Sequence, residues 1–291
     1  MLTASEVEAP LAAPEPAAGP VRRWAARLDL ELRERAGRTR LGRVEHEGPL
    51  RIQRAFHPED DGTAHVVILH PPGGCVGGDE LRIRGRVRAG ARALLSTPGA
   101  GKIYRTNGYR AALHTELAVE AGAALEHVPQ EMVVYEGADA LLRTEVELAP
   151  GSSFLGWEVV CLGRPAADEG FERGSLRLDF TVRLGDRPVF VERGDVAGGG
   201  AFGGARWGLG GHAAFGTLVA TGDATRAVRE ALTDARCEAG ATTLRSAAGP
   251  LTVVRALGPD GTRVRATLEA ARHRIRDAWG RPRIDPGIWR S

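Results

Sequence analysis

Residues 176–193 read LRLDFTVRLGDRPVFVER. Apolar and polar side chains alternate on both sides of a Gly185-Asp186 pair. Successive side chains of a β-strand point to opposite faces, so a two-residue period is typical of a half-buried strand. A Gly-Asp pair between two such runs is typical of a hairpin turn. The stretch therefore predicts two antiparallel strands joined by a tight turn.

The same alternation extends from about residue 27 to residue 220, with Gly, Pro and Asp turns between the runs. Three of these turns form a weak repeat, because Gly90, Gly122 and Gly151 each stand between two expected strands, about thirty residues apart. Such a period favours stacked β-layers over a doubly wound sheet.

The period changes late in the chain. Residues 198–211, GGGAFGGARWGLGG, predict a mobile or tightly turned linker. Apolar side chains then recur at helical spacing in residues 221–240 and again in residues 262–280, with an expected strand at residues 251–257 between them. The sequence therefore predicts a mainly β protein with two late helices.

Composition narrows the class of protein. The formal net charge is +2 with 26% charged residues, so no strong field draws the chain to nucleic acid or anionic lipid. No apolar run approaches the roughly 18 residues of a membrane-spanning helix, so we expect no membrane partner. The three cysteines, Cys75, Cys161 and Cys237, are far apart and odd in number, which favours a reducing compartment and a cytoplasmic location.

The N-terminal residues 1–22 are rich in Pro and Ala and carry acids without a basic leader region. They predict a disordered extension rather than a secretion signal. We expect the β-rich domain to run from residue 23 to residue 291.

Residues 96–105, STPGAGKIYR, superficially suggest a phosphate-binding loop. That motif requires G-x-x-x-x-G-K-[ST] before a helix. Here Ser96 stands at the first glycine position and Ile103 follows Lys102, while residues 113–119 alternate as a strand does. The chain is therefore not predicted to bind or hydrolyse a nucleotide.

Residues 69–83, LHPPGGCVGGDELRI, hold the densest set of special residues. The glycines permit a tight turn that fixes Asp79, either as a functional acid or as a cap of that turn. The same turn offers the only candidates for a hydrolytic centre, His70 and Cys75, although no nucleophile motif surrounds them. An independent hydrolase is the alternative function.

Several carboxylates fall in otherwise apolar strands. Glu131 lies in residues 125–138, and Glu158 and Glu192 lie in two further apolar runs. A buried carboxylate is costly unless it is paired or faces water or a cation, so an arginine partner and a functional role both stay open. Histidines 70, 114 and 127 lack metal-ligand spacing and are expected to be structural.

Several blocks of the sequence, taken in order, resemble the urease accessory protein UreD (UreH) family. These blocks are PPGG and GGD in residues 71–79, STPGAGKIYR, CLGRP at residues 161–165 and FVERGD at residues 190–195. The resemblance extends from about residue 24 to the C-terminus. Cys75 and His127 depart from it, standing where an aliphatic residue and a Trp are more usual. The resemblance implies one large domain of stacked, superhelically arranged β-sheets with two helices in the C-terminal region, and no enzymatic activity.

The resemblance also implies a scaffold that joins UreF and the GTPase UreG on the apo-urease structural subunits and assists nickel delivery through an internal passage. It implies no tightly bound cofactor, only a nickel ion in transit. An ion that must leave each site needs few and weak ligands, which isolated carboxylates provide. We therefore assign the metal path to four residues in family-matching blocks, the last of them more weakly: Asp79, Glu158, Glu192 and Glu131.

The C-terminus carries large apolar side chains, namely Trp279, Ile288 and Trp289. Aromatic side chains beside arginines are typical of interface hot spots. We therefore expect part of this surface to contact UreF rather than the protein's own core.

Overall fold

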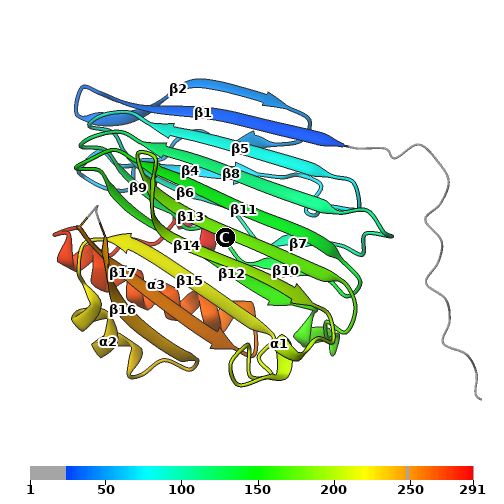
Figure 1. Ribbon diagram of the computed structural model, residues 1–291. Coiled ribbons are helices and arrows are strands. Elements are labelled where there is room, and N and C mark those ends of the chain that lie inside the picture. The colour runs from blue at the N-terminus through cyan, green and yellow to red at the C-terminus, as the bar shows by residue number, and fades with distance from the viewer. Residues whose placement is uncertain (1–23, 247–248, 291) are drawn as a thin grey trace, which may run out of the picture.

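Two large β-sheets face each other in the computed structural model, which describes residues 24–246 and 249–290 (Figure 1). The expected extension at residues 1–22 lies outside the described residues. The first sheet has seven strands. In spatial order these are β14 (Arg187–Ala197), β13 (Ser175–Leu184), β11 (Asp139–Leu148), β8 (Ala111–Val119), β5 (Glu80–Val87), β1 (Ala25–Arg35) and β2 (Arg38–Glu47).

The second sheet has ten strands. Eight of them lie in the order β16 (Glu238–Ser246), β17 (Gly249–Gly258), β15 (Ala214–Thr221), β12 (Ser153–Leu162), β9 (Ala124–His127), β6 (Arg92–Ser96), β4 (Ala64–Leu69) and β3 (Arg51–Ile52). The short strands β10 (Met132–Val134) and β7 (Gly101–Ile103) extend β12 on its β9 side.

The repeated glycine turns connect the two sheets. Gly90, Gly122 and Gly151 have φ values of 75°, 70° and 76°, which glycine adopts without strain, and each turn leads from a strand of the first sheet to one of the second. Strands one repeat apart pair in parallel in both sheets. The predicted stacked β architecture is confirmed. The predicted hairpin is confirmed as well, because β13 and β14 pair antiparallel up to Leu184 and Arg187.

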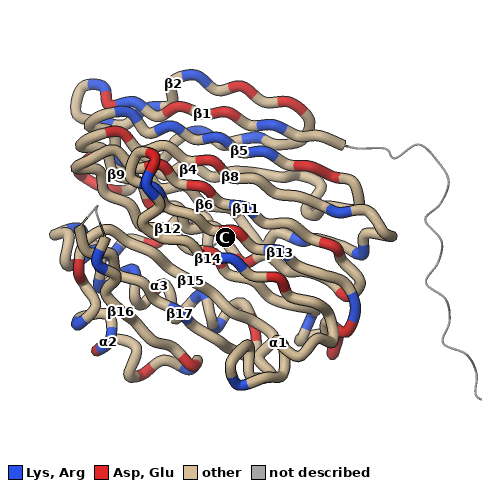
Figure 2. The backbone as a smooth tube through the Cα atoms, in the orientation of Figure 1, with Lys and Arg blue, Asp and Glu red and all other residues tan. Residues whose placement is uncertain are grey.

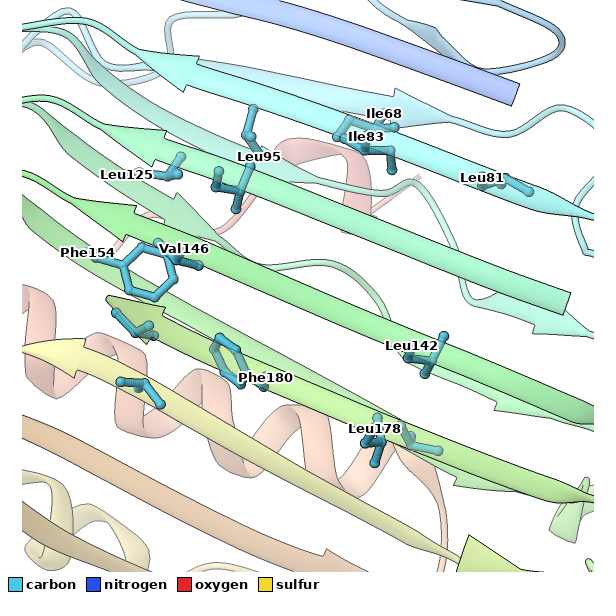
Figure 3. Close-up of a cluster of buried hydrophobic side chains, with 14 of the residues drawn as sticks. Ile68, Leu81, Ile83, Leu95, Leu125, Leu142, Val146, Phe154, Leu178 and Phe180 are labelled. Carbon is cyan, nitrogen blue, oxygen red and sulfur yellow. The ribbon is translucent and has the colours of Figure 1, made fainter. Parts of the chain in front are cut away.

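The space between the sheets is filled by alternate side chains of both (Figure 3). Leu142, Val146 and Phe180 project from the first sheet toward Leu125 and Phe154 of the second. Burying each such side chain contributes about 1.5–3 kcal/mol. This core determines the position of every polar residue that faces inward between the sheets.

Two helices cover the other face of the ten-stranded sheet. Helix α3 (Gly261–Ala278) begins where the Asp260 side chain accepts a hydrogen bond from the Arg263 backbone N–H at 2.8 Å. Leu268 and Ile275 of α3 pack against a second buried cluster that contains Trp157. The prediction of two late helices is confirmed.

The first of these helices is shorter than predicted. Helix α2 (Thr225–Leu232) ends eight residues before the expected end at residue 240. The residues from Glu238 onward form β16 instead, because their backbone pairs with β17 along the whole strand. Sheet pairing therefore overrides the helical spacing of the side chains.

The predicted linker at residues 198–211 is folded. It contains the short helix α1 (Ala201–Gly204), and the backbone N–H of Leu209 donates to the carbonyl of Phe202 at 2.8 Å. Leu209 is buried in the first core cluster. Two short 3₁₀ turns complete the structure, η1 (Pro165–Ala167) and η2 (Gly287–Arg290).

The C-terminal tryptophans contact the protein's own core. The Trp289 ring stacks on Trp157 with 6.0 Å between centroids, and its Nε1–H donates to Ser96 Oγ at 2.9 Å. The Nε1–H of Trp279 donates to the Thr221 carbonyl at 3.2 Å. The expectation that these rings do not contact the protein's own core is wrong, because both make the contacts just described. Both rings are also partly exposed, and contact with UreF stays a prediction.

We expect Trp289→Ala to lower the free energy of unfolding by about 2 kcal/mol, because it removes a half-buried ring, the stacking contact of that ring with Trp157 and a hydrogen bond. Urea denaturation measures the change. The matched control is Trp207→Ala, since Trp207 is 75% exposed and should change stability by less than about 0.5 kcal/mol. Equal losses in the two variants would contradict the packing described for Trp289.

Candidate functional site

The ten-stranded sheet is interrupted beside β12. Leu95 of β6, His127 of β9 and Gly156 of β12 lie at one level, and regular pairing resumes at Val160 with β10 and β7. Between those levels, residues 97–100 and 128–131 leave the sheet as two adjacent irregular segments. They are held together where the Gln130 backbone N–H donates to Thr97 Oγ1 at 2.9 Å.

A cavity of about 330 Å³ lies between the sheets at this interruption. A water molecule takes up about 30 Å³, so the cavity has room for an ion that keeps much of its hydration shell. Most of the wall is apolar, with contributions from Ile83, Leu142 and Met132. The polar side chains on the wall are His70, Thr97, Lys102, Thr115, His127, Gln130, Arg143, Thr144 and Glu158.

Glu158 is the carboxylate on this wall. It lies on the inner face of β12, and Thr144 of β11 in the opposite sheet hydrogen-bonds to it. Burial raises the pKa of Glu158 to about 7, with smaller raising contributions from the carboxylates of Glu192 and Asp179 and a lowering contribution from the Thr144 hydrogen bond. No Arg or Lys within residues 24–246 and 249–290 forms an ion pair with it. Near neutral pH this carboxyl group is therefore partly protonated and partly ionised.

Glu192 of β14 is the only other predicted path residue near Glu158, within electrostatic range of it. Its Oε1 lies 2.8 Å from Nη2 of Arg255 on β17, so the arginine partner that the sequence left open is present. This ion pair joins the two sheets at one side of the molecule.

The other two predicted residues lie apart from this pair. Asp79 is 5% exposed, and its Oδ2 accepts a hydrogen bond from the Val76 backbone N–H at 2.9 Å, as a turn cap does. Glu131 belongs to the segment 128–131, and its Oε2 accepts from Nε of Arg265 on α3 at 3.2 Å. The structure therefore brings together two of the four residues and gives the other two local structural partners.

The family model described as UreD urease accessory protein matches residues 25–290. The chain belongs to the UreD family. A protein named urease accessory protein UreD from Cupriavidus pinatubonensis is 41% identical over 262 residues, covering 88% of each chain. The protein of the same name from Alkalilimnicola ehrlichii is 39% identical over 293 residues, covering 99% of each. Membership of this family places the chain in urease maturation.

The geometry disfavours the alternative of an independent hydrolase. Burial, with a smaller contribution from the nearby Asp79 carboxylate, raises the pKa of the Cys75 thiol to about 12. A thiol that stays protonated at neutral pH is a poor nucleophile. The UreD relatives are likewise named as accessory proteins. In the described part of the chain, no helix combines the length and apolarity needed to span a membrane.

The histidines on the cavity wall were not identified as metal-binding candidates from the sequence. His70 and His127 come from different strand ends and meet the cavity together with the Met132 thioether. The available signal was the two-residue period of β9, which turns His127 to the same side as Leu125. Among the described residues, no three His, Cys, Asp or Glu side chains converge as a metal-binding group. The cavity thus offers isolated side chains that could each donate one ligand to a metal ion, distributed over its wall.

Proposed function

We propose that this UreD family member is a non-enzymatic scaffold that joins UreF and the GTPase UreG on apo-urease. In this proposal Ni²⁺ passes through its interior on the way to the urease active site. The observation that carries the proposal is the cavity at the sheet interruption, where Glu158 faces internal space without a cationic partner among the described residues. Nickel is cargo here, and no tightly bound cofactor is required.

The chemistry of the wall suits an ion in transit. Ionised Glu158 attracts a divalent cation, and Glu192 adds negative potential from the neighbouring sheet. Because neither offers a full ligand set, the ion keeps water ligands and leaves again. We place Glu158 and Glu192 at the centre of the path, with Asp79 and Glu131 as outlying points on either side of the ten-stranded sheet.

The surface supports protein partners rather than nucleic acid. Figure 2 shows acidic and basic residues interspersed along the strands of the seven-stranded sheet. Many form ion pairs, such as Arg84 with Glu116 and Arg177 with Asp195. The described cysteines are free thiols, as a reducing compartment maintains them. We therefore propose action in the cytoplasm, without nucleic-acid or membrane partners.

Replacing Glu158 tests the passage. We expect Glu158→Gln to lower the nickel content of co-expressed urease several-fold, because the amide has a similar shape but cannot ionise. The measurement is metal analysis of purified urease, with co-purification of UreF, UreG and urease scored in parallel. Glu145→Gln, an exposed position on β11, is the matched control. Normal nickel content in the Glu158 variant would remove this residue from the path, and loss of the complex would indicate a structural role instead.

A further inference from the structure

His127 is a buried side chain whose imidazole faces the cavity. It is 8% exposed and lies on the cavity wall at the end of β9. Leu125, two residues earlier, packs into the core between the sheets, whereas Glu126 between them points toward α3. The strand therefore directs the imidazole into the internal space rather than toward the helix layer.

The ring has nothing within the described chain to offset its burial. Burial alone lowers the pKa of His127 to about 4, and no charged or hydrogen-bonding neighbour contributes. At neutral pH the ring is uncharged and presents a nitrogen lone pair, which is the form that binds metals.

The surroundings limit what this nitrogen can bind. Most of the wall is apolar, and the other donors facing the cavity are the His70 imidazole, the Gln130 amide, the Cys75 thiol, the Met132 thioether, hydroxyls and the Glu158 carboxyl group. Gly156 of β12 pairs with His127 of β9. Glu158 follows Gly156 by two residues and therefore lies on the same face of β12. An imidazole with one nearby carboxylate selects a borderline transition-metal ion such as Ni²⁺ over Mg²⁺ or Ca²⁺, which prefer oxygen ligands.

The cavity is accessible from outside at the interruption of the sheet. Pro98 and Gly99 on its rim are exposed, and both line the cavity. Lys102 lies on the same rim, where its Nζ donates to the Ala100 carbonyl at 3.3 Å. A positive charge at the entrance opposes tight retention of a cation, so a site behind it is suited to brief occupancy.

We propose that His127 is a nickel-binding station in this cavity, in which one imidazole nitrogen coordinates the ion and water molecules complete its shell beside Glu158. The identity of the ion rests on the proposed function, whereas the binding itself does not.

Nickel binding to the tag-free, full-length protein tests the proposal without urease. We expect equilibrium dialysis to find one weakly bound Ni²⁺ that excess Mg²⁺ does not displace. His127→Phe should weaken this binding at least tenfold, while His46→Gln, at an exposed position on β2, should leave it unchanged. In the ¹⁵N-histidine spectrum of the unaltered protein, paramagnetic Ni²⁺ should broaden the His127 imidazole signal first, which gives a readout even if the Phe variant folds poorly.

The outcomes separate this inference from the proposed function. If the His127 signal stays sharp at Ni²⁺ concentrations that broaden surface histidines, the station does not exist and only bound water occupies the site. If Glu158→Gln abolishes nickel transfer to urease while His127→Phe neither weakens Ni²⁺ binding nor slows transfer, the passage stands without His127. If both variants transfer nickel normally but His127→Phe loses the bound ion, the station stands and the proposed passage fails.

Discussion

Arg276→Met should lower the free energy of unfolding by about 3–5 kcal/mol, because it breaks a buried network of ion pairs. Arg276 of α3 is fully buried and forms ion pairs with the buried carboxylates of Glu59 and Glu126, while its Nε donates to the Pro282 carbonyl at 2.6 Å. Removing the guanidinium leaves two carboxylates out of water with fewer partners. Methionine has a comparable length, so the loss reports the charge rather than a large cavity.

Two remaining contacts limit the damage. Arg272 still donates to Glu126 at 2.6 Å, and His65 still lies 2.7 Å from Glu59. Urea denaturation at pH 7 measures the change. The control is Arg226→Met in the exposed pair of Arg226 with Glu230, where a change below about 0.5 kcal/mol is expected. A loss below about 1 kcal/mol for Arg276→Met would show that the cluster reorganises around the missing charge.

Glu158→Gln should raise stability at pH 8 by up to about 3 kcal/mol and leave it unchanged near pH 4. The folded-state pKa of Glu158 is about 7, against 4.5 for the unperturbed group. Between these values the folded protein binds more protons than the unfolded chain, so the stability of the unaltered protein falls as pH rises from about 4.5 to about 7. Glutamine does not titrate, so the variant escapes this decline.

Denaturation curves at pH 5, 6, 7 and 8 measure the effect as a difference between variant and unaltered protein that grows with pH. Glu145→Gln, exposed on β11, should show no such growth. Parallel curves for Glu158→Gln would mean that the carboxyl group ionises without penalty, so that the surrounding cavity behaves as open solvent. A variant that is more stable yet delivers less nickel would separate the functional role of Glu158 from any structural one.

The stacked fold was predictable because its signals are local. The two-residue period and the turn glycines Gly90, Gly122 and Gly151 depend only on neighbouring residues, and the structure uses each as expected. The end of α2 was not predictable from spacing, because β16 is determined by pairing with β17, a strand that follows it. The core contacts of the C-terminal Trp289 were not predictable for the same reason, since Ser96 and Trp157 lie far away in the sequence.

The candidate site was predictable only in its residue types. Buried carboxylates are visible in an apolar run, but their partners are not. Glu131 pairs with an arginine that lies 134 residues later in the chain, and Glu192 pairs with an arginine that lies 63 residues later. Asp79, in contrast, hydrogen-bonds to a backbone N–H within its own turn. The cavity itself arises from the interruption between β6 and β7 and between β9 and β10, and each segment alone resembles an ordinary loop.

The ion pair between Arg276 and Glu59 spans 217 positions of the chain. A ribosome therefore synthesises the β-layers long before it adds the helix that neutralises Glu59 and Glu126. Until that helix emerges, the growing chain must keep both carboxylates hydrated, and the sheet around them cannot close completely. We expect the stacked layers to stay open to solvent on that side during translation, and the protein to reach its compact state only when synthesis is nearly finished.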